Sequence, residues 1–116
     1  METKVKVTKK IGVTVGLDEN NLPVKMWWKA SENPKNIQPE VKAIFLSMFD
    51  KDTKDTLKLD LWTKDFQTNE MDRFTYHTLR SLADSYFKAT GNKEMANQMQ
   101  QFAQHFGEKT EVLVKE

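Results

Sequence analysis

The sequence predicts an α+β domain in which a small, mostly antiparallel sheet is packed with helices. Most of residues 4–30 and all of residues 57–62 alternate apolar and polar side chains, which is typical of half-buried strands. Residues 68–91 and 93–106 instead repeat apolar side chains at helical spacing. A further helix is predicted over residues 39–49, so the expected element order is β-β-α-β-α-α.

Length and composition limit the class of protein. The 116 residues are expected to form one domain over residues 1–116. Eighteen basic and 17 acidic side chains leave a net charge of +1, which argues against a global attraction to nucleic acid or to an anionic membrane. The sequence has no cysteine, so disulfides and thiolate chemistry are excluded. Because no apolar run approaches the ~20 residues of a membrane span and no secretory signal is recognisable, we expect a soluble, cytoplasmic protein.

The first two strands are expected to form a hairpin. Residues 4–18 carry apolar side chains at odd positions, which are Val5, Val7, Ile11, Val13, Val15 and Leu17. Residues 18–21 are typical of a turn, and Pro23 opens the second strand. In that strand one face carries Val24, Met26, Trp28 and Ala30, and the other carries Lys25, Trp27 and Lys29. Two alternating segments joined by a tight turn favour an antiparallel hairpin.

The middle of the chain contains the predicted helix of residues 39–49. A loop is expected over residues 31–39, and Pro39 suits the first turn of a helix. The apolar side chains that fall on one helical face are Val41, Ile44, Phe45 and Met48. A polar turn at residues 50–55 then leads into a strand with leucine at positions 57, 59 and 61.

The longest predicted helix, residues 68–91, has the widest apolar face of the chain. We expect Leu79 and Leu82 to be nearly buried in it, with Thr68 or Asn69 as the N-cap and Gly91 closing the C-terminus. The short link after Gly91 predicts that the helix starting near residue 93 runs antiparallel to it. Residues 109–116 fit a short strand, and a frayed helix end or a loose tail fits them nearly as well.

Candidate sites for catalysis or metal binding are weak. Residues 50–55 begin like a calcium-binding loop, but the sixth position is Asp55 instead of glycine and the twelfth is Leu61 instead of glutamate. The two histidines, His77 and His105, fall on polar helix faces without an adjacent nucleophile and orienting acid. We therefore expect no catalytic residues, no metal ligands, no cofactor and no enzymatic activity.

Tryptophans flanked by lysines form the one candidate binding site. Alternation places Trp27 on the face of its strand that points away from the apolar side chains. It likewise places Trp62 on the face of the later strand that points away from the leucines. We name the six residues the Lys–Trp surface; they are Lys25, Trp27, Lys29, Lys58, Trp62 and Lys64. Exposed tryptophans favour a protein partner. The alternatives are that a helix, a loop or lysine stems cover the rings, or that the face binds a small molecule or single-stranded nucleic acid, the last being disfavoured by the low net charge.

Several segments together resemble the gliding-motility protein GldC family. The matching stretches are Lys25–Ala30, Ala43–Ser47, Leu59–Asp65 with Glu70 and Met71, His77–Asp84, and Ala89–Gly91. They cover most of residues 13–106 at similar spacing. The resemblance implies a single GldC-like domain that serves as a non-enzymatic accessory protein of the bacterial gliding-motility machinery. Its partners would be proteins of a motility assembly, and whether it also forms a homo-oligomer stays open.

Overall fold

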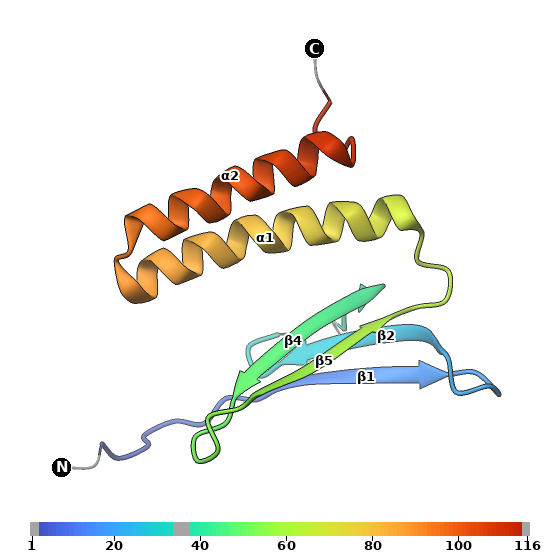
Figure 1. The fold of residues 1–116 in the computed structure, drawn as a ribbon. Helices are drawn as coiled ribbons and strands as arrows, with labels where there is room; N and C mark the ends of the chain where they lie inside the picture. The colour runs from blue at the N-terminus through green and yellow to red at the C-terminus, as the bar shows by residue number, and fades with distance from the viewer. Residues whose placement is uncertain (1–2, 34–37, 115–116) are drawn as a thin grey trace. The chain divides into compact units, whose positions relative to one another are not determined.

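The computed structural model describes residues 3–33 and 38–114, so the predicted loop at 31–39 lies partly outside the described residues. The chain divides into two compact units, Met1–Phe66 and Gln67–Glu116, and each is described by itself (Figure 1). Among the described residues, the first unit contains five strands and the second two helices. The α+β class is confirmed, but the expected order is wrong, because the observed order is β-β-β-β-β-α-α. The strands also form two small sheets instead of one.

The first sheet has the strand order β1-β2-β3. Strand β1 (Ile11–Leu17) pairs antiparallel with β2 (Pro23–Ala30), as the sequence predicts. Strand β1 begins seven residues later than expected, since the predicted start is residue 4. The physical reason is that β2 ends at Ala30, so the chain before Lys10 has no strand beside it to complete a ladder.

The core of the first sheet is Met26, which is completely buried. It lies opposite Val15 of β1 on one side and Val41 of β3 (Glu40–Val41) on the other. Directly opposed residues share a face of an antiparallel sheet, so Trp28, two residues after Met26, lies on this same face. The apolar face predicted for β2 is therefore confirmed.

The helix predicted over residues 39–49 is wrong, because this segment forms β3 and β4 (Ala43–Phe49). Strand β4 pairs antiparallel with β5 (Thr56–Trp62) in a second sheet, and Asp50 and Asp55 close the turn between them. The aliphatic pairs on one face of this hairpin are Ile44 with Leu61, Leu46 with Leu59, and Met48 with Leu57. A short apolar run fits a helix and a strand alike, and pairing with the leucine row favours the strand.

The two predicted helices are confirmed as α1 (Thr68–Thr90) and α2 (Lys93–Lys109). Gly91 ends α1 in the left-handed conformation with φ of 71°, as expected of a glycine C-cap. The N-cap differs from the expectation, since it is Gln67, whose backbone N–H donates to the Glu70 carboxylate at 3.1 Å.

One tyrosine and several small residues are buried along the contact between α1 and α2. The residues buried along the two helices are Tyr76, Ala83, Ala96, Ala103 and Gly107. The prediction that Leu82 is nearly buried is wrong, because it is 54% exposed, and the neighbouring Ala83 is fully buried instead. Small residues let two helix axes approach closely, so the buried stripe lies about 100° around α1 from the leucine that the apolar pattern favours.

Candidate functional site

The Lys–Trp surface is divided between the two sheets. Lys25, Trp27 and Lys29 belong to β2 and are called the β2 group. Lys58 and Trp62 belong to β5, and Lys64 follows it; these three are called the β5 group. In both strands the predicted alternation holds, because the tryptophan lies on the face opposite the buried or aliphatic row.

Trp27 of the β2 group packs against its own sheet. Two carbons of its indole ring lie 3.8 and 4.0 Å from the position that a Cβ on Gly16 would occupy. Because Gly16 has no side chain, the indole ring packs directly against its backbone, and Trp27 is half-buried. This contact is with the backbone of β1, whereas the predicted alternative has a helix, a loop or lysine stems over the rings.

Trp62 of the β5 group is the more accessible tryptophan, with 49% of its surface exposed. It lies opposite Ala43 of β4, whose small side chain leaves the indole uncovered on that side. An open groove of about 320 Å³ runs beside the ring. The residues that line the groove are Leu22, Pro23, Asp60, Leu61, Trp62 and Lys64.

The lysines of the β5 group are paired with carboxylates. Lys58 Nζ lies 3.2 Å from an oxygen of Asp60, and Lys64 Nζ lies 2.9 Å from an oxygen of Asp18. Each pair is locally neutral, so the β5 group is less cationic than its lysines suggest. Within the described part of the chain, Lys25 and Lys29 of the β2 group have no ion-pair partner.

Backbone hydrogen bonds bring the beginning of β2 beside the end of β5. The Lys64 N–H donates to the Pro23 carbonyl at 3.0 Å, and the Thr63 N–H donates to the Lys42 carbonyl at 2.8 Å. Thr63 is also buried, and its hydroxyl donates to Asp65 at 2.6 Å. The structure thus joins Trp62 and Lys64 to Leu22 of the β1–β2 turn and Pro23 at the start of β2 in one groove. None of the β2 group lines this groove.

Asp18 is a site residue that the sequence does not predict. Its carboxylate accepts the backbone N–H groups of Asn20 and Leu22 at 2.8 and 3.0 Å, as well as the Lys64 ammonium. The bond from Lys64, followed by that from Leu22, holds the pKa of Asp18 below its ordinary value of 3.8. The turn around Asp18 is readable from sequence as an Asx turn, but no local signal points to Lys64.

The lowered pKa of Asp18 predicts a sensitivity of the first unit to acid. The unfolded chain takes up this proton at higher pH than the folded chain, so the contribution is present above pH 3.8 and is lost as the pH falls through the lower folded pKa. Asp18→Asn should therefore flatten the fall of the urea midpoint on acidification, and Lys64→Ala should flatten it partly. Lys51→Ala in the exposed β4–β5 turn serves as the control. An acid dependence of Asp18→Asn identical to that of the unchanged protein would contradict this assignment.

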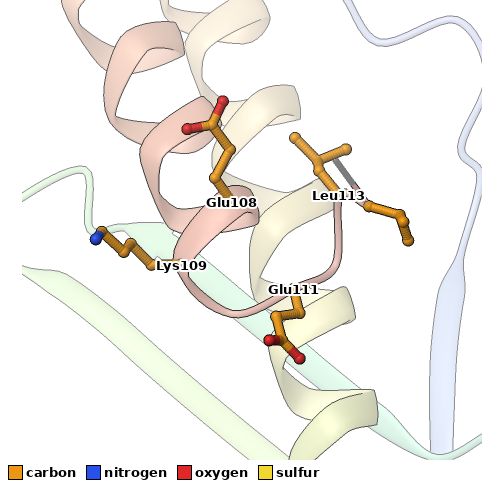
Figure 2. Close-up of a pocket in the computed structure, with 5 residues that line it drawn as sticks. Glu108, Lys109, Glu111 and Leu113 are labelled. Carbon is orange, nitrogen blue, oxygen red and sulfur yellow. The ribbon is translucent and has the colours of Figure 1, made fainter. Parts of the chain in front are cut away.

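The other features considered for chemistry do not gather reactive groups. One Asp50 oxygen accepts the backbone N–H groups of Asp52 and Thr53, each at 2.9 Å, so the calcium-like segment is a hydrogen-bonded turn. Within the described residues, no three acidic, histidine or cysteine side chains are grouped as metal ligands would be. A cavity of about 480 Å³ lies at the end of α2, where Glu108 and Lys109 of the helix lie near Glu111 and Leu113 of the following turn (Figure 2). It contains no residue of the Lys–Trp surface.

Comparison with known proteins identifies the family. A family model described as gliding motility-associated protein GldC-like matches residues 23–112, which include β2 to α2 and all six residues of the Lys–Trp surface. The chain belongs to the GldC-like family. This GldC-like chain is therefore associated with gliding motility. No curated protein and no solved structure matches it. In the part of the GldC-like chain that the structure describes, neither helix is long and apolar enough to cross a membrane.

Proposed function

We propose that this GldC-like protein is a non-enzymatic, cytoplasmic accessory protein of the gliding-motility machinery that binds a protein partner through the Lys–Trp surface. The observation that carries the proposal is Trp62, a half-exposed indole beside an open and mainly apolar groove. Tryptophan combines a large apolar area with few rotatable bonds, which makes it a frequent anchor of protein interfaces. The family match supplies the motility context.

The charges around Trp62 favour a protein over single-stranded nucleic acid. A nucleic-acid groove needs cations that remain free to contact phosphates. Lys58 and Lys64 are each held by a carboxylate, and Asp60 would lie beside an incoming phosphate. A protein interface, by contrast, commonly has a polar rim of paired charges around an aromatic centre.

A small molecule is the second candidate ligand. The groove at Trp62 has a volume of about 320 Å³, which is at the lower end of the roughly 300–1,000 Å³ of ligand pockets. If a small molecule is the ligand, protein purified from its native cell should carry a compound that is absent from a Trp62→Ala variant. Mass spectrometry of the denatured protein measures this directly.

Replacing both tryptophans tests the proposed function. In a gliding bacterium whose own copy has been deleted, Trp27→Ala with Trp62→Ala should fail to restore spreading and should no longer capture the motility partner. Trp62→Ala alone should account for most of the loss, since Trp62 is the more exposed ring. The matched control is Phe49→Ala, which removes an aromatic side chain that is 68% exposed in β4 and lies outside the Lys–Trp surface.

The fold of each variant has to be compared before the result is interpreted. Circular dichroism and the urea midpoint of Trp62→Ala should stay close to those of the unchanged protein, because half of the ring is already in water. Full spreading and full partner capture by the folded double variant would overturn the role of the Lys–Trp surface.

A further inference from the structure

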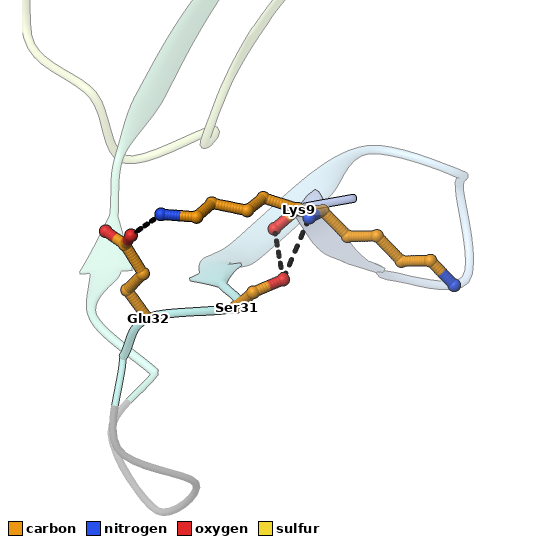
Figure 3. A network of polar contacts seen from close by, with 4 residues as sticks. Lys9, Ser31 and Glu32 are labelled. Carbon is orange, nitrogen blue, oxygen red and sulfur yellow. Dashed lines mark hydrogen bonds and ion pairs between the residues drawn. The ribbon is translucent and has the colours of Figure 1, made fainter. Parts of the chain in front are cut away.

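Residues 3–10 have the pattern of a strand but lie outside β1. The ladder between β1 and β2 ends at Lys10, whose N–H donates to the Ser31 hydroxyl at 2.8 Å and whose carbonyl accepts the Ser31 N–H at 3.0 Å. One residue earlier, the Lys9 ammonium pairs with Glu32 (Figure 3). These contacts fix the direction in which the chain enters β1.

Before Lys9 the alternating segment is exposed. Val5 and Val7 are 83% and 69% exposed. Within the described part of the chain, residues 3–8 make no backbone–backbone hydrogen bond outside the strand ladders. Strand β1 is also the terminal strand of its sheet, so its outer edge continues into this segment. An open edge of this kind is a template for another strand.

We propose that residues 3–10 extend β1 by pairing with an extended acidic segment of a partner protein. In strand addition, main-chain hydrogen bonds supply the affinity and alternate side chains supply the specificity. Val5 and Val7 would contact apolar side chains of the added strand. Lys4, Lys6 and Lys10, which lie on the other side, would face its carboxylates.

The charge of the segment favours an acidic partner over a second copy of this chain. Residues 3–10 contain four lysines and no acidic residue, and only Lys9 has a carboxylate partner in the described structure. Suppose that two copies of this segment pair antiparallel with their valines side by side. The even-numbered residues of one copy then lie opposite the even-numbered residues of the other. Lysines would then oppose one another, which is destabilising. Glutamate or aspartate at the same places would be stabilising.

This edge is separate from the proposed function of the Lys–Trp surface. Residues 3–10 lie before the part of the chain that the GldC-like model matches. They contain no residue of the groove at Trp62. A negative result for the Lys–Trp surface therefore does not decide the proposal for residues 3–10, and the reverse is also true.

Hydrogen exchange on the full chain tests the inference with a defined probe, a short end-blocked peptide of alternating glutamate and valine. The glutamate peptide should slow amide exchange in residues 3–10, and a peptide with lysine in place of glutamate should not. Lys4→Glu with Lys6→Glu should weaken binding of the glutamate peptide by about tenfold. The control is Lys51→Glu with Lys54→Glu, which reverses two exposed charges of the β4–β5 turn and should leave binding unchanged.

A backbone variant separates strand pairing from simple charge attraction. Val5→Pro with Val7→Pro removes two N–H groups without a change of charge, and it should abolish protection by the glutamate peptide. The urea midpoint should be unaffected, since both valines are exposed. Trp62→Ala should still show the protection.

Four results would overturn the inference. They are equal protection by the lysine peptide, unchanged protection in the proline variant, concentration-dependent protection without peptide, and binding to anionic phospholipid vesicles without any response to the peptide. The third result would assign the edge to a second copy of the chain, and the fourth to a membrane surface.

Discussion

Met26→Ala is expected to lower the free energy of unfolding by about 2–5 kcal/mol. Met26 is fully buried between the strands on either side of it, where it lies opposite Val15 and Val41. Truncation removes most of its buried apolar surface and leaves a cavity that neighbouring strands cannot close without breaking their ladders. Urea unfolding followed by tryptophan fluorescence measures the loss.

Met48→Ala is the matched control for this prediction. It removes the same atoms from another strand, but Met48 is 49% exposed. The expected cost is therefore about 1 kcal/mol or less. Equal losses for the two methionine variants would mean that Met26 is not the packing centre of the first sheet.

Gly107→Ala is expected to destabilise the helical hairpin by about 1–3 kcal/mol. A Cβ at this position would lie 2.7 and 2.8 Å from two ring carbons of Tyr76 and 2.9 Å from a methyl carbon of Leu113. The Tyr76 ring is only 3% exposed, and its hydroxyl accepts a hydrogen bond from Arg80 at 3.1 Å, so the ring cannot move away freely. We expect the free-energy cost of this clash to exceed the ~1 kcal/mol by which alanine is favoured over glycine within a helix.

The measurement for Gly107→Ala is the helical circular-dichroism signal during thermal and urea unfolding. Gly12→Ala is the control, because an added Cβ at Gly12 has no atom within 4 Å. It should change stability little. A Gly107→Ala protein that is more stable than the unchanged protein would show that helix propensity outweighs the contact with Tyr76.

Elements with a clear local sequence signal are predictable, whereas features that depend on distant parts of the chain are not. Strands β2 and β5 and both helices could be predicted, because each carries a clear period and recognisable ends such as the turn at Asp18 and the glycine at Gly91. For β4 the sequence predicts a helix, because Ile44, Phe45 and Met48 fit one face of a helix as well as they fit a strand. Its leucine partners in β5 follow after a turn, and pairing with them favours the strand.

The same distinction applies to the candidate site. The alternation of β2 and β5 correctly separated Trp27 and Trp62 from the apolar rows of their strands. It could not show that Trp27 packs on Gly16, nor that Lys64 is neutralised by Asp18, 46 residues away. The pairing of strands and turns in the fold brings these residues together, and no single stretch of sequence predicts that pairing.

The sequence by itself determined the periodic elements, most of their ends, the faces of the strands and the family. Tertiary structure alone determined which side chains are buried and which charges are paired. In α1 the apolar pattern favours Leu82, yet Leu82 is half-exposed and the buried residues are Tyr76 and Ala83, because α2 approaches on their side. The physical reason is that periodicity reports the preference of a segment for water, whereas burial depends on the shape and charge of neighbours that are distant along the chain.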